Sequence, residues 1–141
     1  MPDDRLLRHL PGLLAQANRE IHGGLARILK PEGLPVEQWR ILEALAAGEG
    51  LTVTALAGRV GMNLPALSKT IDRMVTRALV HRKRHPRDRR SVQIFISQFG
   101  LESIQSREAE LERYHAALAD RLGPRGAGRL ARLLKALLPE S

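Results

Sequence analysis

The stretch from Leu51 to Ile96 most constrains the fold of this chain, because it joins two short helical patterns, a tight turn and a basic hairpin. In the second helical pattern, roughly Leu64 to Ala78, apolar residues recur at steps of three and four, which predicts one buried face. The members of this apolar stripe are Leu67, Ile71, Met74, Val75 and Leu79. The pattern therefore predicts an amphipathic helix whose opposite side faces solvent.

The solvent side of this helix combines small, hydroxylated and cationic side chains. Small side chains would let the helix approach base edges, while Lys and Arg can reach guanine acceptors or phosphates. The candidate DNA-contacting residues on this helix are Pro65, Ala66, Ser68, Lys69, Thr70, Arg73 and Arg77. The alternative is a plain packing helix, since amphipathic helix pairs are common in proteins that bind no DNA.

The preceding segment favours the DNA-binding interpretation. Its apolar residues form a second stripe (Val53, Leu56, Ala57, Val60), and Gly61 then predicts a helix end. Thr52 and Asn63 are predicted to cap the two helices, and Pro65 lies in the first turn of the second, where the missing amide hydrogen is harmless. Together these features predict a helix-turn-helix.

A basic hairpin follows the helix pair. Val80–Arg84 and Ser91–Ile96 are predicted to pair as strands, and the second alternates apolar and polar residues. A hairpin beside a recognition helix is a wing, whose arginines can enter a neighbouring minor groove or contact the backbone. The alternative is a solvated charged surface. The candidate DNA-contacting residues of the wing are Arg84, Arg87, Asp88, Arg89 and Arg90.

Three segments carry a family resemblance: GLPVEQWRILEALA (Gly33–Ala46), LPALSKTIDRM (Leu64–Met74) and DRRSVQIFISQFG (Asp88–Gly100), the last with an Asp-x-Arg tip. In this order they resemble the second helix, the recognition helix and the wing signature of the MarR family of bacterial winged-helix regulators. The resemblance implies a transcriptional regulator. It also implies that Asp88 holds the guanidinium of Arg90 by a bidentate pair.

Two residues depart from the family pattern. Ser97 stands where the family usually has a Thr that caps the next helix, and it keeps the capping hydroxyl. Ala78 stands where the family usually has Gly before the wing, so the turn must either avoid a left-handed residue or carry strain. The angle of the wing is therefore left open by the sequence.

The charge of the chain is concentrated in this same segment. The 141 residues carry a net charge of +8, which indicates a polyanionic partner. Between Lys69 and Arg90, nine Lys or Arg against two Asp give a net charge of +7. Double-stranded DNA is the predicted partner, because the few aromatic residues (3%) argue against stacking platforms for single strands.

Composition excludes several other classes of protein. The chain has no cysteine, which excludes disulfides, thiolate metal sites and thiol redox sensing. No apolar run approaches the roughly 20 residues of a membrane span, and the amino terminus lacks a signal-peptide core. We expect a cytoplasmic protein without membrane contact.

The segments outside the winged region are helical patterns. Pro11 is predicted to mark the start of the main N-terminal helix, and Ser97 the start of one long helix that ends at Gly123-Pro124. Their narrow apolar seams favour partner helices over a globular core. We therefore predict a mainly α fold with a small β-hairpin wing, in which residues 1–33 and 98–141 form a helical dimerisation bundle and residues 34–97 the winged helix-turn-helix. The alternative is a monomer that folds its tail back.

No enzymatic constellation is present. The five histidines show neither His-Glu-x-x-His spacing nor a Cys partner, and there is no phosphate-binding loop. Glu108, Glu112 and His115 share one helix face that could hold a divalent metal, but such trios are common on surface helices by chance, so we predict no catalytic site, metal or cofactor. The predicted function is a ligand-released repressor that acts as a homodimer on a pseudo-palindromic operator. The resemblance implies a small aromatic or phenolic anion as effector, bound between the DNA-binding lobe and the bundle, where Trp39 could line the site or simply belong to the core. The alternative function is an architectural protein that coats DNA without an effector.

Overall fold

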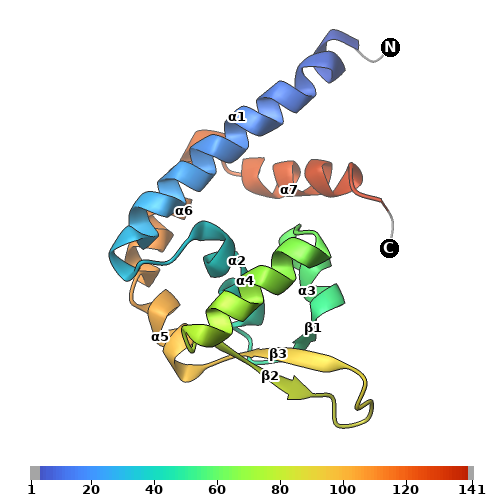
Figure 1. Cartoon of the computed structure of the whole chain (residues 1–141). Coiled ribbons are helices and arrows are strands. Elements are labelled where there is room, and N and C mark those ends of the chain that lie inside the picture. The colour runs from blue at the N-terminus through green and yellow to red at the C-terminus, as the bar shows by residue number, and fades with distance from the viewer. Residues whose placement is uncertain (1–3, 140–141) are drawn as a thin grey trace. The chain divides into compact units, whose positions relative to one another are not determined.

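The computed structural model describes residues 4–139, so the outermost residues of the two predicted dimerisation segments lie outside the described part. Figure 1 shows helices along most of this chain and one small sheet. The elements are α1 (Asp4–Leu29), the 3-10 turn η1 (Lys30–Glu32), α2 (Val36–Leu45), β1 (Leu51–Thr52), α3 (Val53–Val60), α4 (Leu64–Thr76), β2 (Val80–Arg84), β3 (Val92–Ile96), α5 (Gln98–Gln105), α6 (Glu108–Leu122) and α7 (Gly126–Ala136). The predicted mainly α fold with a small β-wing is confirmed.

The chain forms two compact units, Met1–Arg107 and Glu108–Ser141. In the first unit, α2, α3, α4, β3 and α5 surround one apolar core. Its largest fully buried side chains include Leu42, Leu56, Leu67 and Ile94, each with no exposed surface. Because each contributing element supplies one apolar face, the opposite faces of α3, α4 and the sheet are left to solvent.

The helix-turn-helix is held by the predicted caps. Thr52 Oγ1 accepts a hydrogen bond from the amide of Ala55 at 3.2 Å, and Asn63 Oδ1 accepts one from the amide of Ala66 at 2.9 Å. Between the two helices Gly61 adopts φ 70°, a left-handed conformation that glycine adopts without steric cost. The sharp turn between α3 and α4 is therefore a direct product of local sequence.

The sheet has three strands in the order β1-β3-β2, all antiparallel. The predicted strand Val80–Arg84 is confirmed, and the predicted partner begins at Val92 instead of Ser91. The sequence gives no sign of β1, which pairs Leu51 with Ile94. Two residues are too few for a strand pattern, and β1 forms because the end of the loop before α3 lies beside β3.

Ser97 and Gly100 join the sheet to α5. The Ser97 hydroxyl accepts from the amide of Gly100 at 2.9 Å, so the predicted cap is confirmed. Gly100 is buried, and a Cβ at this position would lie 2.2 Å from the carbonyl oxygen of Leu79. Only glycine permits this close approach between α5 and the start of β2.

Ala78 is the residue at which the sequence left two possibilities open. It adopts φ 60° and is the single non-glycine residue with positive φ in the part of the chain that the structure describes. The Ala78 amide donates to the carbonyl of Val75 at 3.0 Å and the Leu79 amide to that of Met74 at 2.9 Å, which is a Schellman motif. A left-handed Ala costs roughly 1–2 kcal/mol, so the turn carries strain.

The predicted helix start at Pro11 is wrong, because α1 runs without interruption from Asp4 to Leu29 and contains Pro11. A proline inside a helix leaves the carbonyl four residues earlier, here that of Leu7, without an intrahelical donor. Both Leu7 and Pro11 are exposed, so water can hydrate that carbonyl.

The predicted single helix from Ser97 to Leu122 is also wrong, since α5 ends at Gln105 and α6 begins at Glu108. Two serine hydroxyls bond to backbone carbonyls here: Ser103 Oγ to Phe99 at 2.8 Å and Ser106 Oγ to Ser103 at 2.9 Å. Such local bonds compete with a continuous helix. In addition, Arg107 Nε binds Glu32 Oε1 at 3.3 Å, which fixes the chain where the first unit ends.

The second unit consists of α6 and α7. The predicted break at Gly123-Pro124 is confirmed, with Gly123 at φ 84°. None of the helices in residues 4–139 is long and apolar enough to cross a membrane.

Candidate nucleic-acid interface

Helix α4 presents a polar face opposite its buried stripe. Leu67 and Met74 have no exposed surface, whereas Ser68, Lys69 and Arg73 are exposed. Pro65 is exposed and Ala66 half-buried at the leading end of the helix. The exposed face therefore carries a small leading end followed by cationic side chains, as the sequence predicts.

Thr70 lies differently from the other candidates on α4. Its side chain is buried, with 7% of the residue surface exposed, and its hydroxyl donates to the carbonyl of Ala66 at 3.0 Å. The periodic pattern could not place it, because a threonine at the edge of an apolar stripe can turn either way. Thr70 is therefore part of the packing side of α4.

Arg77 has a partner inside the protein. Its Nη1 donates to Oε1 of Gln38 at 2.9 Å, and Gln38 on α2 is buried with 6% of its surface exposed. A buried amide oxygen is costly to leave without a donor. Arg77 therefore links the end of α4 to α2, a role that the sequence did not indicate.

An ion pair joins the recognition helix to the wing. Arg82 on β2 binds the carboxylate of Asp72 on α4, and both side chains are exposed. The two residues are ten positions apart, so only the return of the chain along β2 brings them together. Figure 1 shows β2 leaving the end of α4 and leading to the wing tip.

The cationic side chains of α4 and the wing are exposed, and most of them have no partner in the described part of the protein. All nine Lys and Arg residues from Lys69 to Arg90 are exposed. Arg77, Arg82 and Lys83 make the contacts described above and below, whereas the other six form no ion pair or side-chain hydrogen bond within residues 4–139. These six are Lys69, Arg73, Arg84, Arg87, Arg89 and Arg90. Cations that the fold does not use are available to phosphates and base edges.

Hydrogen bonds to His85 and Asp88 shape the wing tip. His85 Nδ1 accepts from the backbone amides of Arg87 at 3.1 Å and Asp88 at 3.2 Å, and the His85 amide donates to the carbonyl of Ser91 at 2.8 Å. Asp88 Oδ1 accepts from the backbone amide of Arg90 at 3.1 Å. The sequence pattern does not indicate this role of His85, because it depends on the turn that follows the residue.

The predicted bidentate pair between Asp88 and the Arg90 guanidinium is not formed in the described structure, where Asp88 binds the Arg90 backbone instead. A short aspartate two residues before a backbone amide closes a local Asx-turn, which needs no side chain from Arg90. The Arg90 guanidinium is thus left exposed, and Asp88 positions it only through the backbone.

The base of the wing is braced by a ring stack. His81 and Phe95 lie on paired positions of β2 and β3, with ring centroids 5.7 Å apart and planes 9° apart. The ammonium of Lys83 lies 5.3 Å from the centroid of the Phe95 ring, within the range of a cation-π interaction. The ammonium of Lys83 therefore interacts with a side chain of the wing itself.

Trp39 is half-buried and lines a surface hollow of about 330 Å³. The other residues of this hollow are Arg40, Glu43, Ala44, Arg59 and Val60. Arg40 also donates from its guanidinium to the carbonyl of Val60 at the end of α3. The hollow therefore combines Trp39 with two cationic side chains and the carboxylate of Glu43. It is lined by α2 and α3 only, and so lies within the predicted DNA-binding segment and not between this segment and the bundle.

In residues 4–139, no group of three or more His, Cys, Asp or Glu lies close enough to hold a metal ion.

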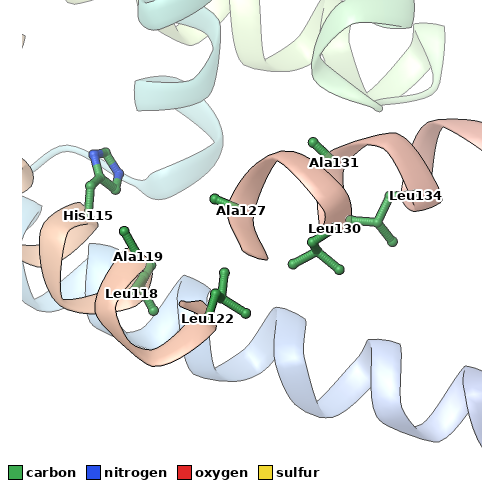
Figure 2. Close-up of a pocket in the computed structure, with 8 residues that line it drawn as sticks. All are labelled: His115, Leu118, Ala119, Leu122, Ala127, Leu130, Ala131 and Leu134. Carbon is green, nitrogen blue, oxygen red and sulfur yellow. The ribbon is translucent and has the colours of Figure 1, made fainter. Parts of the chain in front are cut away.

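The second unit contains an apolar hollow of about 310 Å³ between α6 and α7. Figure 2 shows Leu118 and Leu122 on α6 and Leu130 and Leu134 on α7 beside this hollow. Leu130 and Leu134 are 41% and 38% exposed, too much for an internal core. This apolar surface therefore lacks cover within its own unit.

Comparison with known proteins places this geometry in a class. Residues 32–91 match the family model described as the MarR family. A mutant of MarR from E. coli complexed with operator DNA has 24% sequence identity and a TM-score of 0.80, covering 92% of this chain and 94% of that chain. The repressor CouR bound to a 23-mer DNA duplex has 23% identity and a TM-score of 0.79, with 97% of each chain covered.

NadR in complex with 4-hydroxyphenylacetate has 26% identity and a TM-score of 0.78, with 88% of each chain covered. No curated protein matches the sequence. The predicted resemblance is confirmed: the chain has the winged-helix fold of the MarR-family transcriptional regulators. Two of the solved structures it resembles are named as a transcriptional regulator and a transcriptional repressor.

Proposed function

We propose that this protein is a homodimeric, ligand-released transcriptional repressor that binds a pseudo-palindromic operator in double-stranded DNA in the cytoplasm. The observation that carries the proposal is the set of six exposed cations, on α4 and the wing, that the fold does not use. A helix-turn-helix without such cations would be a packing motif. With them it has the charge and the shape to bind duplex DNA.

In the proposed complex, α4 lies in the major groove. Lys69 and Arg73 would contact bases or phosphates, and the small residues Pro65, Ala66 and Ser68 would allow close approach. The wing would place Arg84, Arg87, Arg89 and Arg90 at the neighbouring minor groove or backbone. The ion pair between Asp72 and Arg82 supports a fixed relation between these two contacts.

Dimerisation is proposed through residues 1–33 and 98–141. Helix α1 exposes Leu6, Leu7, Leu13 and Leu14 at 40–65%. Leu133 on α7, and Leu137 and Leu138 directly after it, are 57–67% exposed. Apolar stripes on terminal helices without cover in the subunit suit a partner helix from a second copy. Two-fold symmetry would also match two half-sites on DNA.

The proposed effector is a small aromatic or phenolic anion. The hollow beside Trp39 offers a ring face together with the cations Arg40 and Arg59. NadR, to which this chain is similar, has been solved with 4-hydroxyphenylacetate, a ligand of that chemical class. An effector would release DNA if it favoured a subunit arrangement that cannot bind both half-sites.

The DNA proposal is tested by selecting bound fragments from random duplex DNA with the full chain and footprinting the product. A repressor should protect two half-sites about one helical turn, roughly 34 Å, apart. Uniform protection without a recovered sequence would instead favour the architectural alternative, a protein that coats DNA.

The dimer is tested by Leu133→Glu, because Leu133 is 67% exposed and the subunit does not need it for its own core. We expect sedimentation as a monomer and much weaker operator binding. Ala136→Glu on the polar side of α7 adds the same charge and serves as the control. A Leu133→Glu protein that remains dimeric would remove the role proposed for α7.

The effector is tested by fluorescence, since Trp39 is the single tryptophan of the chain. Titration with a panel of aromatic acids should change its emission and release DNA over the same concentration range. Release of DNA without any change in emission would place the effector away from Trp39.

A further inference from the structure

The loop between β2 and β3 is held by polar contacts alone. From residue 85 to residue 91 no side chain is buried, so apolar packing does not determine its conformation. The Nδ1 atom of His85 accepts two backbone amides, those of Arg87 and Asp88, at 3.1 and 3.2 Å. Asp88 continues the same chain of contacts by accepting the amide of Arg90.

An imidazole can accept at Nδ1 only while that nitrogen carries no proton. A protonated ring would direct a hydrogen at the two amides it now accepts, so both contacts would be lost. Imidazole is the side chain whose protonation ordinarily changes between about pH 5 and 8. Of the hydrogen bonds that hold the loop, the two to the amides of Arg87 and Asp88 therefore require an Nδ1 atom of His85 that carries no proton.

We propose that His85 is a positioning residue for the wing arginines: its neutral ring holds the loop in the DNA-binding arrangement, and its protonation releases the loop and weakens DNA binding. The inference rests on the proposed DNA-binding function. His85 need not touch DNA, because it acts through the backbone of Arg87 and Asp88 and, through Asp88, on Arg90.

The charges around His85 make the direction of the change in DNA affinity with pH a test of the proposal. Arg84 precedes it on β2, the loop carries Arg87, Asp88, Arg89 and Arg90, and the facing start of β3, Val92 and Gln93, is uncharged. A proton on His85 adds positive charge to a surface that binds a polyanion. Electrostatics alone therefore predicts tighter binding in acid, whereas loss of the wing conformation predicts weaker binding.

The test uses the full chain and its selected operator at fixed ionic strength, with dissociation constants measured from pH 8 to pH 5.5. We expect the parent protein to weaken roughly tenfold or more towards the acid end, because both amide contacts to Nδ1 of His85 are lost. His85→Ala should be weakened by a similar factor already at pH 8. His85→Asn should bind like the parent at pH 8, because an Asn side chain supplies the same local acceptor and does not titrate.

Comparison of the parent with His85→Asn also isolates His85 from His81, whose stack on Phe95 is present in both proteins. The expected acid weakening should be largely absent in His85→Asn. Acid binding that is as tight as, or tighter than, binding at pH 8 in the parent would overturn the proposal. So would an unchanged affinity in His85→Ala.

A second measurement separates this inference from the proposed function. Hydrogen exchange at the amides of Arg87 and Asp88 in the free protein should accelerate in His85→Ala and remain slow in His85→Asn at pH 8. This readout requires no DNA. If the parent binds no operator at any pH, the proposed function fails. If the amides exchange at equal rates in the three proteins, the role proposed for His85 is wrong, whatever the result with DNA.

Discussion

The recognition helix and the wing tip carry similar charge but are held in place by different forces. Helix α4 inserts Leu67, Ile71 and Met74 into the core, each with at most 1% of its surface exposed. The loop from His85 to Ser91 buries no side chain and depends on hydrogen bonds to His85 and Asp88. The position of α4 is therefore tied to global stability, whereas the wing tip can change conformation while the domain stays folded.

The forces that hold the two regions differ in free energy. A fully buried leucine contributes about 2–5 kcal/mol, while a single exposed hydrogen bond contributes about 1 kcal/mol. Substitutions in the two regions should consequently separate into those that unfold the domain and those that change DNA binding only.

The largest effect is expected for Leu67→Ala, which removes a side chain with no exposed surface from the inner face of α4. The free energy of unfolding should fall by about 2–5 kcal/mol because a cavity remains. Urea titration measures it, with Ser68→Ala on the exposed face as the control. A loss below about 1 kcal/mol would mean that packing does not position α4.

Arg73→Ala and Arg77→Ala should separate a DNA contact from a structural contact on the same helix. Arg73→Ala should cost about 1–3 kcal/mol of operator binding and relax preference at one base pair, with stability unchanged. Arg77→Ala should lower stability by about 1 kcal/mol, since the buried Gln38 oxygen loses its donor. Binding and unfolding measured on both variants would refute this division if the two profiles coincide.

Asp88→Ala tests the wing tip. We expect operator binding to weaken by about 1 kcal/mol, roughly fivefold, because the Arg90 amide loses its acceptor. Asp88→Asn keeps an oxygen acceptor and removes the negative charge, so it should bind at least as tightly as the parent. Tighter binding by both variants at fixed salt would reduce Asp88 to a repulsive charge.

Ala78→Gly tests the junction between α4 and β2, and it should have the smallest effect. Glycine relieves the left-handed strain at φ 60° but adds backbone entropy in the unfolded chain, leaving a net stabilisation of about 0.5–1 kcal/mol. Thermal unfolding provides the measurement, and operator affinity should stay constant. A destabilised Ala78→Gly protein would show that the turn is not strained.

Sequence patterns predicted much of the fold where local chemistry decides the outcome. The caps Thr52, Asn63 and Ser97 and the helix stop at Gly61 were predictable, because each acts within a few residues of itself. The strand Val80–Arg84 was predictable from its position before a basic loop. The exposed cations of α4 and the wing followed from the same patterns.

Helix boundaries were predicted less well. Pro11 was expected to start a helix that in fact begins at Asp4, because an exposed helix tolerates a proline whose orphan carbonyl is hydrated. The break between α5 and α6 was missed, because it depends on serine back-bonding and on an ion pair between Arg107 and Glu32. That pair joins residues far apart in the sequence.

By itself, the sequence determined the apolar stripes, the caps, the turn and the concentration of positive charge in one segment, because these are properties of short windows. Tertiary structure decided which charges remain available for DNA. It engaged Arg77 with Gln38 and Arg82 with Asp72, and it buried Thr70. The physical reason is that a hydrogen bond or ion pair forms only between groups that the folded chain brings within about 3 Å of each other. Residues that meet in this way can lie far apart in the sequence, so their spacing does not reveal the contact.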